Sequence, residues 1–222
     1  MTHVPFNQQL LNVCAALLLL LSFAMLSQRR IVSLVNLFAV QGVVLTAATV
    51  LIAWRTGEGH LYFSALLTLA LKVAFLPWLL HRLIRRLGVY WDTEPLLNIS
   101  GTMLMGILIV VFAFGLAQPI THLASTSMRN AIGIAVAVVL LAFLMMITRR
   151  KAMSQVVGFL SMENGLFFGA MSATYGMPMV VELGVALDVL VAVLVLGVFF
   201  FQIREQFDSL DLHHLERLNE QP

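Results

Sequence analysis

The chain has 222 residues, of which 60% are hydrophobic and only 11% are charged, with a formal net charge of +2. An ordinary soluble domain carries about 25% charged residues, so this composition excludes a soluble globular protein. Because the basic residues stand in short clusters between apolar segments, a nucleic-acid surface is excluded as well. The single cysteine, Cys14, excludes a disulfide framework, an iron–sulfur cluster and a thiolate zinc site within this chain.

Seven apolar segments are each long enough to cross a membrane, which takes about 20 residues. They predict an all-α membrane protein with about seven transmembrane helices, at residues 7–27, 31–53, 61–81, 96–118, 130–148, 152–173 and 178–202. The first segment has no basic stretch before it and no small-residue cleavage site after it. We therefore expect a retained helix there and not a signal peptide.

Basic residues are unevenly divided among the connections. The second, fourth and sixth connections hold only Arg55 and Arg129. The first, third and fifth hold Arg29, Arg30, Arg82, Arg85, Arg86, Arg149, Arg150 and Lys151. Because cytoplasmic loops carry the excess of basic residues, we expect the odd connections and the C-terminus in the cytoplasm. The N-terminus is then periplasmic, in a multi-pass protein of a bacterial inner membrane.

Four ionisable side chains interrupt the apolar segments: Lys72, Glu163, Glu182 and Asp188. An ionised residue near the bilayer centre costs about 2.5–3.5 kcal/mol, so such residues usually mark an ion or proton pathway. The helical rise places Lys72 and Glu163 about 16 Å into their helices, Asp188 about 15 Å, and Glu182 nearer the outer surface. Because burial and nearby charges shift their protonation, the four predict a proton relay. The alternative is a static ion pair that fixes helix register, for which Lys72 and Asp188 are the candidates.

An internal repeat relates residues 28–42, which end in Gln41-Gly42, to residues 149–165, which end in Asn164-Gly165. The next helix in each half carries a central charge. This pattern predicts two three-helix units joined by one helix, an organisation common in transport folds, although two apolar segments can also match by chance. The domains predicted are an N-terminal unit at 1–95, a linking helix at 96–129, a C-terminal unit at 130–203 and a cytoplasmic tail at 204–222.

Smaller features carry structural predictions. Pro77, five residues after Lys72, frees a backbone carbonyl and can kink the third helix, although such prolines are often only packing features. Gly165 and Gly169 form a pair of small residues suited to close helix packing. The neighbouring His213 and His214 point about 100° apart on a helix and do not predict a metal site. No nucleophile with a paired base and no phosphate-binding loop is found, so catalysis by this chain alone is not expected.

Three motifs resemble a known family over nearly the whole chain. They are Lys72-Val73-x3-Pro77, Gly158-Phe159-Leu160-Ser161-Met162-Glu163-Asn164-Gly165 and Val181-Glu182-Leu183-Gly184-Val185-Ala186-Leu187-Asp188. The family is hydrogenase-4 component E, a membrane subunit of group 4 nickel–iron hydrogenase complexes of the formate hydrogenlyase type. The C-terminal unit also resembles the K subunit of respiratory complex I, whose two buried glutamates would match Glu163 and Glu182. Gln41 stands where the N-terminal unit would need an acid, which argues against a second carboxylate pair.

The resemblance implies an accessory subunit without an active site, whose proton relay would use Lys72, Glu163, Glu182 and Asp188. Its partners would be the hydrogenase membrane anchor and antiporter-like subunits, which it would link. The nickel–iron centre and iron–sulfur clusters would lie in other chains, with no cofactor or metal in this one. Two alternatives stay open, a subunit of a cation/proton antiporter complex and a structural membrane scaffold without a relay. A free-standing carrier is disfavoured, because few Gly or Pro interruptions are present to build a substrate cavity.

Overall fold

The computed structural model describes residues 6–87, 98–118, 126–174, 176, 177 and scattered positions between 184 and 197. The all-α fold class is confirmed. The elements are α1 Phe6–Ser27, α2 Ile31–Thr56, α3 Gly59–Thr68, the π-helical segment η1 Leu69–Phe75, α4 Leu76–Leu87, α5 Ile99–Ala117, α6 Thr126–Thr148 and α7 Ala152–Thr174. Together α3, η1 and α4 form one continuous span.

Within this described part, six helical spans are long and apolar enough to cross a membrane, by length and composition. Their bounds agree with the first six predicted segments to within a few residues. The seventh predicted segment, 178–202, lies mostly outside the described residues, and so does the tail at 204–222. The division into two repeated units stays a prediction.

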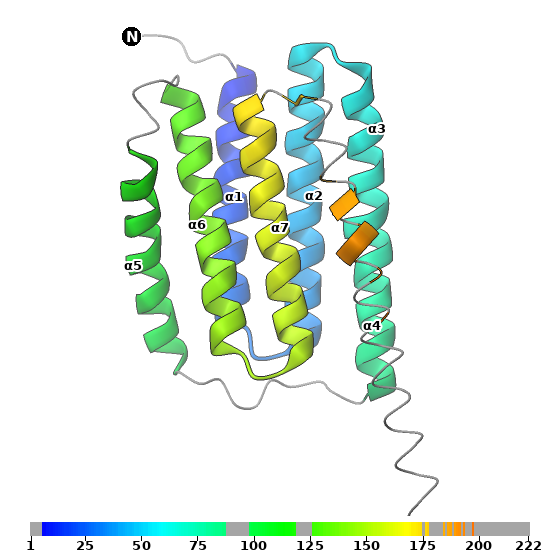
Figure 1. Cartoon of the computed structure of the whole chain (residues 1–222), viewed down its shortest axis with the longest axis vertical. Helices are drawn as coiled ribbons and strands as arrows, with labels where there is room; N and C mark the ends of the chain where they lie inside the picture. Colours follow the sequence, from blue (N-terminus) through cyan, green and yellow to red (C-terminus); the bar gives the residue numbers. More distant parts are fainter. Residues whose placement is uncertain are drawn as a thin grey trace, which may run out of the picture.

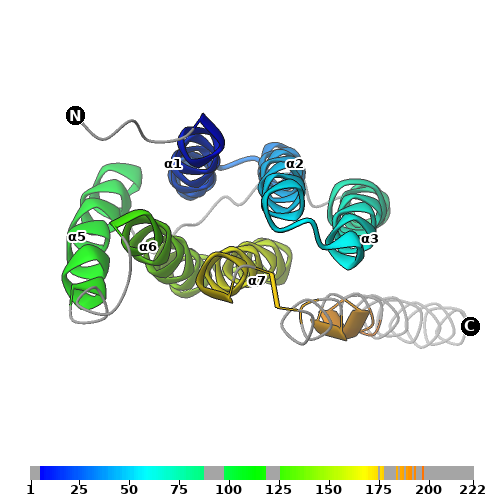
Figure 2. The ribbon, with the colours of Figure 1, turned by 90° about the horizontal axis from the view of Figure 1, so that it is seen from above.

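The described helices stand in two rows (Figures 1 and 2). One row holds α1, α2 and the α3–η1–α4 span, and the other holds α5, α6 and α7. The rows meet where α1 packs on α5 and α6 and where α2 packs on α7. The α1–α2 connection, the α6–α7 connection and the end of α4 all lie at one end of the bundle (Figure 1). The three basic clusters of the sequence therefore gather at that end, which we call the basic end; its cytoplasmic location stays a prediction.

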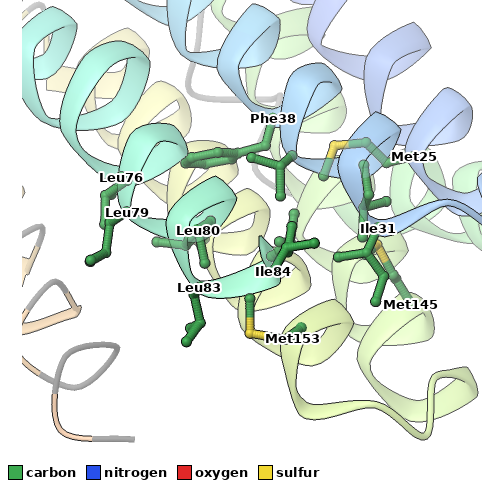
Figure 3. Packing of buried hydrophobic residues seen from close by; sticks show 14 of the residues in the cluster. Met25, Ile31, Phe38, Leu76, Leu79, Leu80, Leu83, Ile84, Met145 and Met153 are labelled. Carbon is green, nitrogen blue, oxygen red and sulfur yellow. The ribbon is translucent and has the colours of Figure 1, made fainter. Parts of the chain in front are cut away.

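Two apolar clusters fill the space between the rows. The cluster nearer the basic end includes Met25, Phe38 and Leu80, from α1, α2 and α4 (Figure 3). The second cluster includes Leu18 and Leu45, which lie further from that end along the same two helices. Side chains from several helices interlock in each cluster, so the clusters fix the relative depth of the helices.

Small residues set the closest contacts. A Cβ atom at Gly165 would lie 2.9 Å from Val138 Cγ1, and one at Gly169 would lie 2.9 Å from Ala135 Cβ. Both neighbours belong to α6. The predicted packing role of the Gly165 and Gly169 pair is therefore confirmed, and its partner is the preceding helix.

The disturbance expected from Pro77 takes the form of the π-helical segment η1. At its end the Leu76 N–H bonds to Leu71 O, five residues back. Pro77 has no N–H, and in an α-helix its ring would clash with the carbonyl of Val73. The wider π turn relieves this clash, and π segments of this kind are frequent at functional sites. Lys72 lies inside it.

Candidate functional site

A layer of polar side chains separates the two apolar clusters. It consists of Ser22 on α1, Gln41 on α2, Lys72 on η1, and Glu163 and Asn164 on α7, each at most 5% exposed. On α1, α2, α7 and the α3–η1–α4 span, the buried apolar residues on one side of this layer belong to one cluster and those on the other side belong to the second. The polar groups therefore lie inside the bundle, between the two apolar clusters.

The centre of the layer is a buried ion pair. Lys72 Nζ donates hydrogen bonds to Glu163 Oε1 at 3.0 Å and to Asn164 Oδ1 at 2.9 Å. The same ammonium lies 5.5 Å from the centroid of the Phe167 ring, within reach of a cation–π interaction. Lys72 and Glu163 are each 1% exposed. Such burial strengthens their attraction, but it also removes the hydration of both charges, so the pair needs its additional hydrogen bonds.

Hydrogen bonds continue from this pair across the bundle. Asn164 Nδ2 donates to Gln41 Oε1 at 3.1 Å, and Gln41 Nε2 donates to Ser22 Oγ at 3.2 Å. The Ser22 hydroxyl then donates to Leu18 O at 2.9 Å. Side chains from η1, α7, α2 and α1 are thus linked in one series, which we call the polar chain.

The ammonium group determines the direction of every hydrogen bond in the polar chain. A protonated lysine has donors only, so Asn164 must present its oxygen to Lys72 and its NH₂ group to Gln41. Gln41 must then accept through oxygen and donate onward, which leaves Ser22 to donate to the backbone. All these dipoles point their oxygen ends toward Lys72, and aligned hydrogen bonds polarise one another. The polar chain therefore presents oxygen atoms to the Lys72 side chain.

The polar chain also changes depth as it crosses the bundle. By helical rise, Asn164 lies about 18 Å from the first residue of α7, and Gln41 lies about 15 Å from the first residue of α2. Ser22 lies only about 8 Å from the last residue of α1. All three reference residues are at the basic end, so the polar chain runs from the middle of the membrane span toward that end.

Gly42 lets η1 approach α2 beside the polar chain. A Cβ atom at this position would lie 3.3 Å from Lys72 Cβ and 3.4 Å from Lys72 O. A larger residue would therefore push the lysine backbone away from α2. The dipeptide Gln41-Gly42 thus supplies both a hydrogen-bonding partner for Asn164 and the space that Lys72 needs.

Only part of the layer can exchange protons. Amide side chains do not take up or release protons near neutral pH, so Asn164 and Gln41 can orient Lys72 but cannot carry a proton for it. Lys72 and Glu163 are the two titratable members. Their 3.0 Å hydrogen bond is short enough for proton transfer between nitrogen and oxygen.

The predicted site residues are brought together in part. Lys72 and Glu163 are in contact, whereas Glu182 and Asp188 lie outside the described residues. The sequence offered Asp188 as a candidate partner of Lys72 in a static pair, which stays untested; among the described residues the ion-pair partner of Lys72 is Glu163. The sequence signal for this pair was that Lys72 and Glu163 lie at the same depth in their helices. The hydrogen bond that joins Gln41 to Asn164 was not predicted from the sequence.

A second buried cation lies at the basic end. Arg149, which is 5% exposed, donates from Nη2 to Leu26 O at 2.9 Å and to Gln28 O at 2.5 Å. These carbonyls are at the C-terminus of α1, where helix ends lack backbone donors. The residue therefore caps α1 from the end of α6. From the sequence we had counted it only as a loop charge.

No group of three or more His, Cys, Asp or Glu side chains that could hold a metal ion is found within the described ranges. His213 and His214 fall outside those ranges.

Comparison with known proteins extends these observations. The chain is 23% identical over 212 residues to hydrogenase-4 component E of Escherichia coli (strain K12), a match that covers 96% of this chain and 98% of that protein. The hydrogenase-4 component E of Shigella flexneri gives the same values. The resemblance found in the motifs is thereby supported along the full length. No protein-family model matches the chain, and no solved structure matches it.

A higher identity is found with a mycobacterial protein. Uncharacterized protein Rv0085 of Mycobacterium tuberculosis (strain ATCC 25618 / H37Rv) is 36% identical over 212 residues, covering 95% of this chain and 96% of the relative. Identity at this level over nearly both full lengths shows common ancestry and a shared fold. The chain therefore belongs to the same protein family as Rv0085.

Proposed function

We propose that this chain is a non-catalytic membrane subunit of a hydrogenase complex related to respiratory complex I, and that it carries protons through Lys72 and Glu163. The full-length similarity to hydrogenase-4 component E supports the first part. The buried Lys72–Glu163 pair is the observation that supports the second. In this proposal Glu182 and Asp188 are further relay groups, the basic end is cytoplasmic, and the N-terminus is periplasmic.

A buried pair of this kind has two protonation states with the same total charge of zero. Transfer of a proton from Lys72 Nζ to Glu163 Oε1 converts the ion pair into a neutral amine and a neutral acid. Burial disfavours charged groups, so this conversion costs less in the membrane interior than in water. A proton arriving at or leaving either residue can therefore alter the state of the other.

The proposal assigns the remaining machinery to other chains. The nickel–iron centre and iron–sulfur clusters would belong to partner subunits, and this chain would contact the hydrogenase membrane anchor and antiporter-like subunits.

A static Lys72–Glu163 pair that only fixes helix register is the competing explanation, because Lys72 already has two hydrogen-bond acceptors.

The variant Glu163→Gln distinguishes the two explanations. Its amide oxygen still accepts a hydrogen bond from Lys72, but it cannot release a proton. We expect the complex to assemble and to lose proton translocation, measured in inverted membrane vesicles. Glu58→Gln is the matched control, since Glu58 is exposed between α2 and α3, and it should behave as wild type. Coupling at the wild-type level in Glu163→Gln would exclude the relay, and loss of assembly would favour the static pair.

A further inference from the structure

Helix α4 has two distinct faces. Its buried face points into the apolar cluster near the basic end (Figure 3) and consists of Leu76, Leu79, Leu80, Leu83 and Ile84. Their spacing of three and four residues is that of a single helical face. The other face carries Trp78, Arg82, Arg85 and Arg86, which line an open cavity of about 310 Å³. These four residues are called the arginine pocket below.

The side chains of the arginine pocket are held in place by local contacts. The Arg82 guanidinium carbon lies 5.4 Å from the centroid of the Trp78 ring, which is a cation–π distance. Arg85 Nε donates to His81 O at 3.4 Å. Trp78 itself is 52% exposed. A guanidinium that stacks on an indole ring keeps its N–H edge available, so Arg82 can still bind an anion in the plane of that edge.

No ion pair between a carboxylate and an arginine of the pocket is seen among the residues that the structure describes. The described lining of the cavity thus holds three guanidinium groups and no carboxylate. Clustered like charges repel one another, and an anion in the cavity would remove that repulsion.

We propose that the arginine pocket binds the headgroup of an anionic phospholipid. The pocket lies at the end of a membrane-spanning helix, where lipid headgroups lie, and an exposed tryptophan there is typical of the membrane–water interface. Guanidinium groups match the oxygens of a phosphodiester in a two-pronged geometry. The apolar part of Trp78 can lie along the glycerol and acyl chain, which a free phosphate ion would not contact. Basic pockets at helix ends bind anionic headgroups in this way.

Binding can be tested on the full-length protein in lipid nanodiscs. Discs are prepared from phosphatidylcholine with a minority of phosphatidylglycerol, and the lipids retained by the protein are counted by native mass spectrometry. We expect phosphatidylglycerol to be enriched over its share in the disc. In Arg82→Gln/Arg85→Gln/Arg86→Gln this enrichment should fall by at least about tenfold, since each basic residue near the surface contributes to headgroup attraction.

The control removes the same charge from the same end of the bundle. Arg29→Gln/Arg30→Gln/Arg150→Gln alters three exposed residues of the α1–α2 and α6–α7 connections and should keep the enrichment. Equal loss in both triple variants would show a diffuse surface effect and overturn the proposal. The proposal would also be overturned if the wild-type protein showed no enrichment of phosphatidylglycerol. The pocket would then serve another anion, such as an acidic segment of a partner protein.

A lysine variant tests the role of the guanidinium geometry. It also provides a milder substitution in case the glutamine variant does not fold. Arg82→Lys/Arg85→Lys/Arg86→Lys keeps the charge but loses the two-pronged contact, and it should show an intermediate enrichment. Undiminished enrichment in this variant would overturn the assignment of a built site. Competition with inorganic phosphate distinguishes a lipid phosphodiester from a free phosphate ion as the bound group. We expect added phosphate to leave the lipid enrichment unchanged. Displacement of the lipid by phosphate would show a free-phosphate site and overturn the proposal.

Discussion

The Lys72 ammonium on η1 and the Glu163 carboxylate on α7 lie 3.0 Å apart, although 91 residues separate them along the chain. Both are buried between apolar clusters, so each charge is offset by the other in a place where water does not hydrate it. Removal of one partner of such a pair typically costs about 3–5 kcal/mol, whereas apolar replacement of both can be neutral.

Lys72→Met should therefore lower the free energy of unfolding by up to about 3–5 kcal/mol, less if the Glu163 carboxyl takes up a proton. The double variant Lys72→Met/Glu163→Met should recover most of this loss, because no buried charge remains. Mixed-micelle denaturation of the two single variants and the double variant gives the coupling energy. A coupling below about 1 kcal/mol would contradict a direct pair.

The polar chain gives a second stability prediction. Gln41→Leu removes the acceptor of Asn164 Nδ2 and the donor to Ser22, leaving buried polar groups without partners. We expect destabilisation by about 1–3 kcal/mol. Asn36→Leu is the control on the same helix, because Asn36 is exposed and its replacement should change stability by less than about 0.5 kcal/mol. Equal effects of the two substitutions in thermal unfolding would count against the polar chain.

Gly42 tests the approach of η1 to α2. In Gly42→Ala the new Cβ would lie 3.2 Å from Val73 Cγ2 and 3.3 Å from Lys72 Cβ, closer than most such contacts. Overpacking of this kind costs about 1–3 kcal/mol. Gly101→Ala on α5 meets nothing within 4 Å and should be neutral or slightly stabilising. The two variants should shift the melting temperature in opposite directions or by clearly different amounts.

Arg149 should act through hydrogen bonds and not through charge alone. Arg149→Gln removes the donors to Leu26 O and Gln28 O, and we expect a loss of about 1.5–3 kcal/mol in the free energy of unfolding. Arg29→Gln removes an exposed charge from the neighbouring connection and should leave stability nearly unchanged. Similar melting temperatures for the two variants would show that the cap of α1 contributes little.

The orientation in the membrane can be measured by cysteine labelling. Cys14 is buried and can be replaced by alanine to give a cysteine-free background. In intact cells, an impermeant reagent should label a cysteine introduced at Glu58 and should spare one introduced at Arg150. This pattern follows from the excess of basic residues at the Arg150 end. The reverse pattern would invert the topology and place the arginine pocket outside the cell.

The sequence determined the number and limits of the spans that the structure describes. Length and apolar character alone decide which segments can cross a bilayer, so the first six predicted segments coincide with helices. The same reasoning assigned Lys72 and Glu163 to a common depth, because helical rise is constant. Pro77 marked the place where the third span departs from α-helical geometry. These features depend only on the local sequence of each segment and on the thickness of the bilayer.

Tertiary structure alone decided which residues meet. Rotation of each helix about its axis and the choice of neighbouring helices depend on side-chain packing. The sequence hardly encodes this packing, because most of the helices, α4 excepted, are apolar on nearly every face. Lys72 therefore pairs with Glu163, a partner that the sequence did not single out, and Arg149 caps a helix that ends 122 residues earlier. Small residues made these approaches possible, since Gly42 and Gly165 leave no side chain to hold the helices apart.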